Sequence, residues 1–427
     1  MEWFTRIWTV QELALASSVT IMCGRHLIPW EDIFLPSPGF WSWVRFCRLI
    51  HEEKPEHQGR ISIYNKRVDD VKHLRSIKGR LVRAGSDAAF FKRDVWRIIN
   101  VILVSKATNP RDNIYGLYAL LERPGADLPK VDYGQSPIQV FEMFARNIIY
   151  RTDALNDLWL PSFVTHMRKT ISGLPSWVPD WTYTVKESEV NSLQEPSSSV
   201  QATWRSRIHQ QTLACSGQGE LSLKGIQIGC VRSQSSRWPE LPNPPIPTGA
   251  YQGMKEKLET LLDWLSFFEQ NGHSLTGKLE ALLEQLLQTR YFYDDPDVLP
   301  KQRKESKALE QWILSSYLID RQASFTSIYD NFCLGANRLE MLHTIHRKNA
   351  GSILFATAAG HLGTTRGAII ESDGITLLAG CDWPVVVRPE SGGRYRFVGL
   401  ALVQGLMEGQ EWPKDTRVEE MQTFTLV

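Results

Sequence analysis

Glu12 and its neighbour Gln11 are the polar residues whose placement in the sequence best suits chemistry. Both lie in WFTRIWTVQE at 3–12, where a helical repeat of about 100° per residue puts Gln11 within an apolar face and Glu12 at its edge, beside Trp8. A carboxylate that reaches a cleft next to an aromatic ring gains a raised pKa suited to acid/base work. The alternatives are an exposed acid for Glu12 and a backbone-bonded amide for Gln11.

Other candidate motifs are weaker. GHSLTGKL at 272–279 has Leu279 where a phosphate-binding loop needs Ser or Thr to ligate Mg²⁺, so an ordinary turn between helices is expected. No GxSxG or catalytic-cysteine pattern supports acyl transfer. Neither of two acidic or histidine clusters completes a metal site, so we predict no metal and no cofactor; the clusters are Glu340, His343 and His346, and Asp294, Asp295 and Asp297.

The elements that must position these residues begin with a helix at 3–16 and a short buried strand at 18–23, after which Pro29 starts another helix. Asn109-Pro110-Arg111-Asp112 predicts a helix start, with Asn as N-cap, Pro at the first position and Asp near the positive end of the helix dipole. A further helix fits 138–150.

LPSWVPDW at 174–181 contains two prolines and cannot be helical. We therefore expect an extended segment whose Trp177 and Trp181 are held on a neighbouring surface. The polar, serine-rich stretch at 186–203 that follows predicts a linker.

The second part of the chain predicts a hairpin at 213–231 around Ser216-Gly217-Gln218-Gly219 and then helices near 251–269, 274–289, 308–318 and 328–348. Short β-rich runs after 351 predict a small antiparallel barrel or sandwich. The fold class is thus α+β. The expected units are 1–185, a linker at 186–203, a hairpin plus helical region at 204–350 and a β-rich domain at 351–427.

Composition excludes a disordered chain, because 42% of the 427 residues are hydrophobic and 22% are charged. The net charge of +1 gives no overall attraction to nucleic acid, although residues 45–111 carry 16 − 7 = +9 and the helix expected at 71–83 is basic. We expect that face to be solvated. Six scattered cysteines and the absence of a signal peptide or membrane-spanning run predict an intracellular, cytoplasmic protein with reduced thiols.

Four stretches carry a family resemblance by their order: WFTRIWTVQELALASSVTIMCG at the start, ATNPRDNIYGLYALL at 107–121, Val131-Asp132-Tyr133, and LPSWVPDW. Together they resemble the second half of the fungal heterokaryon-incompatibility (HET) domain, and GCDWPVVVRP and GRYRFVGLALVQGLMEGQEW resemble the β-rich segment that ends such proteins. The residues that carry the motifs are Trp3, Trp8, Gln11, Pro110, Arg111, Asp112, Trp177, Pro179, Asp180 and Trp181.

The resemblance implies that the chain is the mostly helical remnant of an α/β HET domain whose first half is missing. The expected consequence is an exposed apolar patch of Trp3, Phe4, Ile7 and Trp8 that promotes association.

The function implied by the resemblance is self/non-self recognition and programmed cell death in fungi, or a related innate-immunity role, exerted through protein partners and with oligomerisation open. The alternative is a nucleotide-directed enzyme, because the HET domain is similar in fold to Toll/interleukin-receptor domains, some of which cleave NAD. Glu12 would then be the catalytic acid, Arg6 a phosphate contact and NAD a substrate, not a cofactor. We expect no activity from one helix alone.

Overall fold

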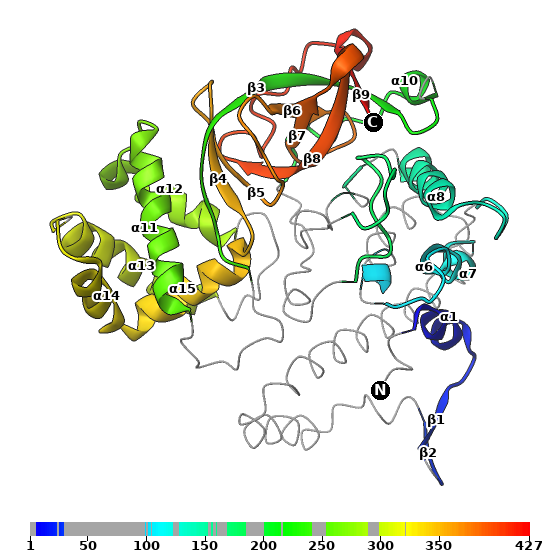
Figure 1. Ribbon diagram of the computed structural model, residues 1–427, viewed down its shortest axis with the longest axis horizontal. Coiled ribbons are helices and arrows are strands. Elements are labelled where there is room, and N and C mark those ends of the chain that lie inside the picture. The colour runs from blue at the N-terminus through cyan, green and yellow to red at the C-terminus, as the bar shows by residue number, and fades with distance from the viewer. Residues whose placement is uncertain are drawn as a thin grey trace.

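Two groups of helices lie on either side of a central sheet in the computed structural model of the chain (Figure 1). The helices and the antiparallel strand pairs confirm the predicted α+β class. The structure describes residues 6–23, 25–29, 99, 101–103, 105–122, 128–152, 155, 156, 159, 169–184, 200–214, 217–240, 253–288, 299–320 and 322–427.

The first described helix is α1, Ile7–Leu15, within the predicted range. Ile7, Val10 and Ala14 are buried on its apolar face as expected, but Thr9 is buried too, because its hydroxyl donates to the Arg6 carbonyl at 2.7 Å. Trp8 is half-buried against the same core. The exposed apolar patch expected here is therefore wrong for residues 7 and 8, while residues 3 and 4 lie outside the described part.

A β-hairpin follows α1 and projects from the molecule (Figure 1). It pairs β1, Thr20–Cys23, with β2, His26–Pro29. Met22 and Leu27 face each other across the two strands and are 74% and 67% exposed, so the predicted strand exists but is not buried. Pro29 ends a strand, and the helix predicted to follow it lies outside the described residues.

The next helices are short. Asn109 Oδ1 accepts from the Arg111 N–H at 3.1 Å, as an N-cap side chain does. The helix itself begins later than predicted, with α6, Asp112–Tyr115. A turn at Gly116 and Leu117 separates α6 from α7, Tyr118–Glu122. A Cβ at residue 116 would lie 2.9 Å from Cγ1 of Ile7, so glycine allows α1 to pack against this turn. The helix predicted at 138–150 is α8, Pro137–Thr152.

The seven-stranded sheet centres on one long strand, β3, Leu221–Arg237, which follows the short helix α10, Gln210–Ala214. The hairpin predicted at 213–231 is wrong, because the turn at 217–219 leads from α10 into β3 and does not connect two strands. Along its length β3 pairs with β9, then β6, then β4, and register shifts mark where it passes between partners.

The other six strands come from the end of the chain, in the sheet order β4-β5-β8-β7-β6-β3-β9. Every pair is antiparallel except a short parallel contact of β8 with β9. The strands form one seven-stranded sheet, in which β3, near one end of this order, also pairs with β4 at the other end. Their bounds are β4, Ile353–Thr357; β5, Leu362–Thr365; β6, Gly374–Leu378; β7, Val385–Pro389; β8, Arg394–Val403; and β9, Gln422–Leu426.

A second helical group lies on the other side of the sheet and has a core of its own, around Trp264, Leu282 and Leu342. The predicted helices are present, except that the one expected at 328–348 is two, separated at Leu334 and Gly335. The elements are α11, Met254–Gln270; α12, Leu275–Leu287; α13, Leu299–Trp312, continued by a π-helical turn, Ile313–Tyr317; α14, Phe325–Cys333; and α15, Ala336–Asn349.

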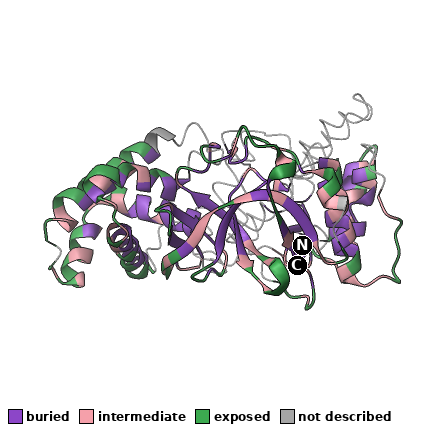
Figure 2. Cartoon of the chain, turned by 90° about the horizontal axis from the view of Figure 1, so that it is seen from above, coloured by how far each residue is buried: buried purple, intermediate pink, exposed green. Residues whose placement is uncertain are grey.

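The sheet and the first core cross the expected domain boundaries. β3 precedes residue 351 and yet pairs with three later strands, so the β-rich unit does not begin at 351. Residues 200–203 of the predicted linker are anchored, since Gln201 N–H donates to the Met407 carbonyl and Ala202 N–H to that of Asp382. The buried residues in Figure 2 run continuously from the first helices into the sheet.

Candidate functional site

Arg6 and Glu12, the residues proposed for catalysis, both lie on the surface of the first helical group. Arg6 precedes α1 and forms an isolated parallel bridge with Lys106, through the hydrogen bond from the Ile7 N–H to the Lys106 carbonyl. Glu12 is exposed near the end of α1. Neither lines the cavity described below.

Gln11 is half-buried on α1. Its Oε1 is shielded from solvent and has no hydrogen-bond partner in the described part of the chain. A backbone partner for the amide oxygen is therefore not found among the described residues, and the predicted role of Gln11 in fixing the helix stays a prediction.

Asp112 joins three of the motif stretches. Its Oδ1 accepts from the Tyr133 hydroxyl at 2.8 Å, and its Oδ2 accepts from Trp8 Nε1 at 3.4 Å. The hydrogen bond to this carboxylate raises the pKa of Tyr133 to about 12. One turn further, the Tyr115 hydroxyl donates to the Asp132 carbonyl at 2.9 Å and accepts from the Asp132 N–H. Residues more than 100 apart in the sequence thus meet at one acid.

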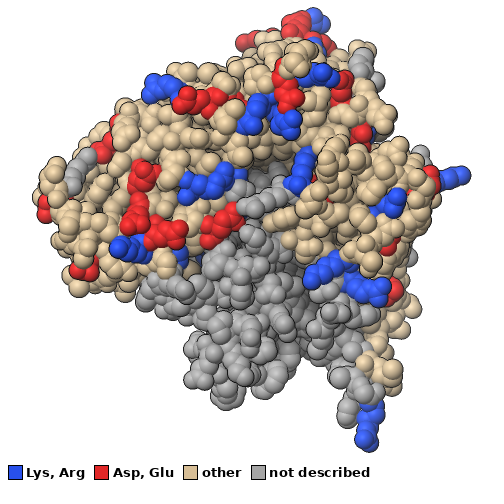
Figure 3. Space-filling view, viewed as in Figure 1, with Lys and Arg blue, Asp and Glu red and all other residues tan. Residues whose placement is uncertain are grey.

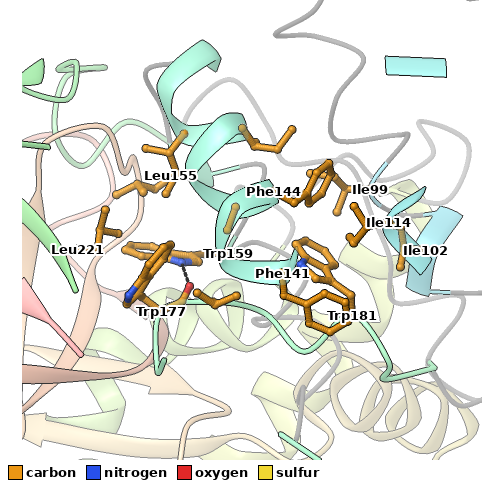
Figure 4. Close-up of a cluster of buried hydrophobic side chains, with 14 of the residues drawn as sticks. Ile99, Ile102, Ile114, Phe141, Phe144, Leu155, Trp159, Trp177, Trp181 and Leu221 are labelled. Carbon is orange, nitrogen blue, oxygen red and sulfur yellow. Dashed lines mark hydrogen bonds between the residues drawn. The ribbon is translucent and has the colours of Figure 1, made fainter. Parts of the chain in front are cut away.

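The fourth stretch, 174–181, is free of helix and lies between α8 and the sheet. A turn bends it, because the Val178 N–H donates to the Pro175 carbonyl. Trp177 and Trp181 are both buried, as expected. Figure 4 shows Trp181 beside Phe141 and Phe144 of α8, and Trp177 beside Trp159. The rings of Trp181 and Phe144 meet edge-on with centroids 5.7 Å apart, and Trp159 Nε1 donates to the Trp177 carbonyl at 2.9 Å.

Asp180 organises the loop around this stretch. Its carboxylate is 1% exposed and accepts five hydrogen bonds, from the backbone N–H groups of 170, 171 and 182 and the hydroxyls of Thr170 and Thr182. Burial alone would raise the pKa of Asp180, but the hydrogen bonds from Thr182 and Thr170 outweigh it and hold the pKa below its ordinary value. Asp180 is therefore a charged structural acceptor.

A cavity of about 460 Å³ opens where this loop meets the sheet. The loop contributes Lys169 and Ser176, whose hydroxyl oxygen accepts from the Phe397 N–H at 2.8 Å and so joins the loop to β8. Volumes of this size are typical of small-molecule sites. The lining residues are Trp159, Lys169, Leu174, Ser176, Trp177, Val178, Pro179, Asp180, Arg237, Glu240, Arg366, Gly367, Ala368, Arg396, Phe397, Val398, Gly399 and Leu400.

Four cations line this cavity, each held in place by neighbouring groups. Arg237 donates to the carbonyls of residues 351, 366 and 367, and Arg366 donates to the Lys348 carbonyl at 3.2 Å. Arg396 donates from Nε to Glu390 at 2.6 Å, and the Lys169 ammonium donates to the Pro175 carbonyl. On the face seen in Figure 3, Lys and Arg side chains are interspersed with Asp and Glu side chains.

Lys169 as a whole residue is exposed, but its ammonium lies against the cavity wall. Loss of hydration there lowers the pKa of Lys169 to about 7, Asp180 opposes the shift, and the positive charge of Arg396 adds to it. The two cations are thus close enough to repel each other. The sequence did not point to any of the four cations, because their positions in the chain span more than 200 residues. Of the motif residues named from the sequence, only Asp180, Trp177 and Pro179 line the cavity.

Comparisons with family models, with curated proteins and with solved structures found no match. Among the described residues, no helix is both long and apolar enough to cross a membrane, and no three side chains of His, Cys, Asp or Glu are grouped to hold a metal ion. Most of the basic stretch at 45–111, and the loop at 294–297, lie outside the described residues.

Proposed function

We propose that this chain is a signalling protein of the heterokaryon-incompatibility type, acting inside fungal cells in self/non-self recognition and programmed cell death. The observation that supports this proposal is the junction at Asp112. Three stretches that carry the family resemblance, represented by Trp8, Asp112 and Tyr133, contact one another through the Asp112 carboxylate. Residues shared with a domain family are expected to form one structural unit if the resemblance is real.

The proposed mode of action is association with protein partners in the cytoplasm. Arg6 and Glu12 are exposed on the surface and away from the cavity, which favours binding over NAD cleavage. On this proposal the described helices around α8 are the mostly helical part of a HET domain, and the sheet is the β-rich segment that follows it.

The test is expression of the whole chain in a fungal host, with viability and cellular NAD followed together. We expect loss of viability with unchanged NAD, the same loss for Glu12→Ala, and rescue of viability by Asp112→Ala at an equal protein level on immunoblots. A fall in NAD that Glu12→Ala prevents would establish the enzymatic alternative. Full viability of cells that accumulate the folded wild-type chain would refute the cell-death proposal.

A further inference from the structure

The cavity between the 169–180 loop and the sheet has an excess of positive charge. Its lining includes four cations and two carboxylates, Asp180 and Glu240. The Asp180 carboxylate already accepts five hydrogen bonds from its own loop, so it is committed to the fold. The cations come from four separate places in the chain: Lys169, Arg237, Arg366 and Arg396.

Two of these cations stand at the open side of the cavity. Arg396 has a side chain that is 55% exposed, and Lys169 is exposed as a residue. The charge of Arg396 lowers the tendency of Lys169 to hold a proton, because like charges at short range repel. An anion placed between them would remove that repulsion. The oxygens of a carboxylate or phosphate would also accept directional hydrogen bonds from the N–H groups of both side chains.

Part of the cavity lining is apolar. Trp159 and Phe397 belong to it and stack on each other with ring centroids 4.5 Å apart. Leu174 and Val398 add to this apolar surface. A ligand that matches both the cations and this surface must carry an anionic group and a flat or aliphatic body.

We propose that this cavity binds a small organic anion, with its carboxylate or phosphate group between Lys169 and Arg396 and its apolar body against Phe397 and Trp159. The site is independent of the proposed cell-death function, since none of the three residues joined at Asp112 lines it. Binding of the anion stabilises the protonated form of Lys169.

The pH dependence follows from the groups that face Lys169 in the cavity. Asp180 favours its protonated form, while Arg396 disfavours it. The remaining charged groups of the lining are Arg237, Arg366 and Glu240. With the pKa of Lys169 at about 7, the charged fraction falls between pH 6 and pH 8. Benzoate keeps its charge over this range, so its affinity should fall up to about tenfold.

The experiment is calorimetric titration of the whole chain with four probes: benzoate, phenyl phosphate, inorganic phosphate and neutral benzyl alcohol. We expect one saturable site for at least one aromatic anion, with at least tenfold weaker binding of benzyl alcohol and of inorganic phosphate. The stronger of benzoate and phenyl phosphate identifies the anionic group. Arg396→Gln and Lys169→Met should each weaken binding by fivefold or more, because each removes a charged donor.

Arg417→Gln is the matched control, because Arg417 is also exposed and bonded to one acid, Glu420, at a position outside the cavity. It should bind like the wild type, and circular dichroism should show that all three variants are folded. The proposal is overturned if no probe binds saturably, if benzyl alcohol or inorganic phosphate binds as tightly as the aromatic anions, or if the folded cavity variants bind like Arg417→Gln.

Discussion

At the scale of single residues, buried polar side chains join segments that are distant in the sequence. Asp180 accepts five hydrogen bonds in its loop. Glu142 on α8 accepts from Arg146 and from the Gly219 N–H at 2.7 Å, which joins α8 to the turn before β3. Such groups add little net stability while paired, but the loss of one partner leaves the others desolvated without compensation. Their replacement should therefore be costly.

Asp180→Ala should lower the free energy of unfolding by about 2–4 kcal/mol, because it leaves the backbone N–H groups of 170, 171 and 182 without their acceptor. Chemical denaturation at neutral pH measures the loss. Asp415→Ala, at an exposed acid, is the control and should change stability by less than about 0.5 kcal/mol. Equal stability of the two variants would show that the Asp180 bonds are not needed to hold the loop.

His346 predicts a pH dependence of stability. It is 2% exposed on α15, and its Nδ1 accepts from Trp238 Nε1 at 2.9 Å. Burial, with smaller effects of Lys257 and His343, lowers the pKa of His346 to about 3. Between this value and the ordinary 6.5, the unfolded chain binds a proton that the folded chain does not. The stabilising contribution is therefore complete above about pH 6.5 and decreases as the pH falls toward 3.

We expect the wild type to lose roughly 1–2 kcal/mol more than His346→Gln between pH 7 and pH 5, measured by denaturation at each pH. Gln retains an acceptor for Trp238 and does not titrate. The matched control His361→Gln, at a half-buried histidine, should follow the wild type. A pH profile of His346→Gln identical to that of the wild type would contradict a buried neutral histidine.

At the scale of elements, β3 holds the sheet together by pairing with three strands in succession. Gly225 lies where β6 and β9 both pair with it. A Cβ at this position would lie 2.3 Å from the Leu377 carbonyl oxygen, a backbone atom that cannot turn away. The close approach of the strands therefore requires glycine at this point.

Gly225→Ala should destabilise the protein by about 1–3 kcal/mol or more, because the strand must shift away from β6. Gly229→Ala is the matched control on the same strand, since the atom nearest to its Cβ would be Ala359 Cβ, at an ordinary 3.5 Å. We expect that variant to lie within about 1 kcal/mol of the wild type. Thermal unfolding distinguishes the two, and equal melting temperatures would show that the strands at residue 225 are less tightly packed than described.

At the scale of the whole molecule, the first helical group and the sheet share one core. Phe144 and Trp181 from the first part of the chain belong to the same buried cluster as Leu223, Trp383 and Phe424. The expected boundary at 186–203 thus separates two parts of the sequence but not two cores. Each part alone would expose an apolar face to water.

Cleavage of the folded chain at a protease site inserted within 186–199 should leave the two pieces associated, because the shared core remains buried. We expect co-elution in gel filtration and one unfolding transition. The piece from residue 200 onward, expressed alone, should bind an apolar dye that the intact chain does not. Separation of the cleaved pieces without denaturant would show that they are independent domains.

Local features could be predicted from the amino-acid sequence. Two prolines exclude helix at 174–181, and apolar periodicity places α11 and α12 within a few residues of their predicted ends. These features depend on residues that are close together in the sequence, so they can be read from it directly. The predicted hairpin at 213–231 failed because a glycine-rich turn before a strand is the same signal whether a strand or a helix precedes it.

Which segments meet is set by the tertiary structure. The contact of Trp8 with Asp112, and the gathering of Lys169 and Arg396 around one cavity, depend on pairings across more than a hundred residues. No local pattern encodes such a partner, since the same side chain on the same helix or strand is exposed or buried according to what packs against it. The candidate site therefore depends on how the loop at 169–180 packs against the sheet.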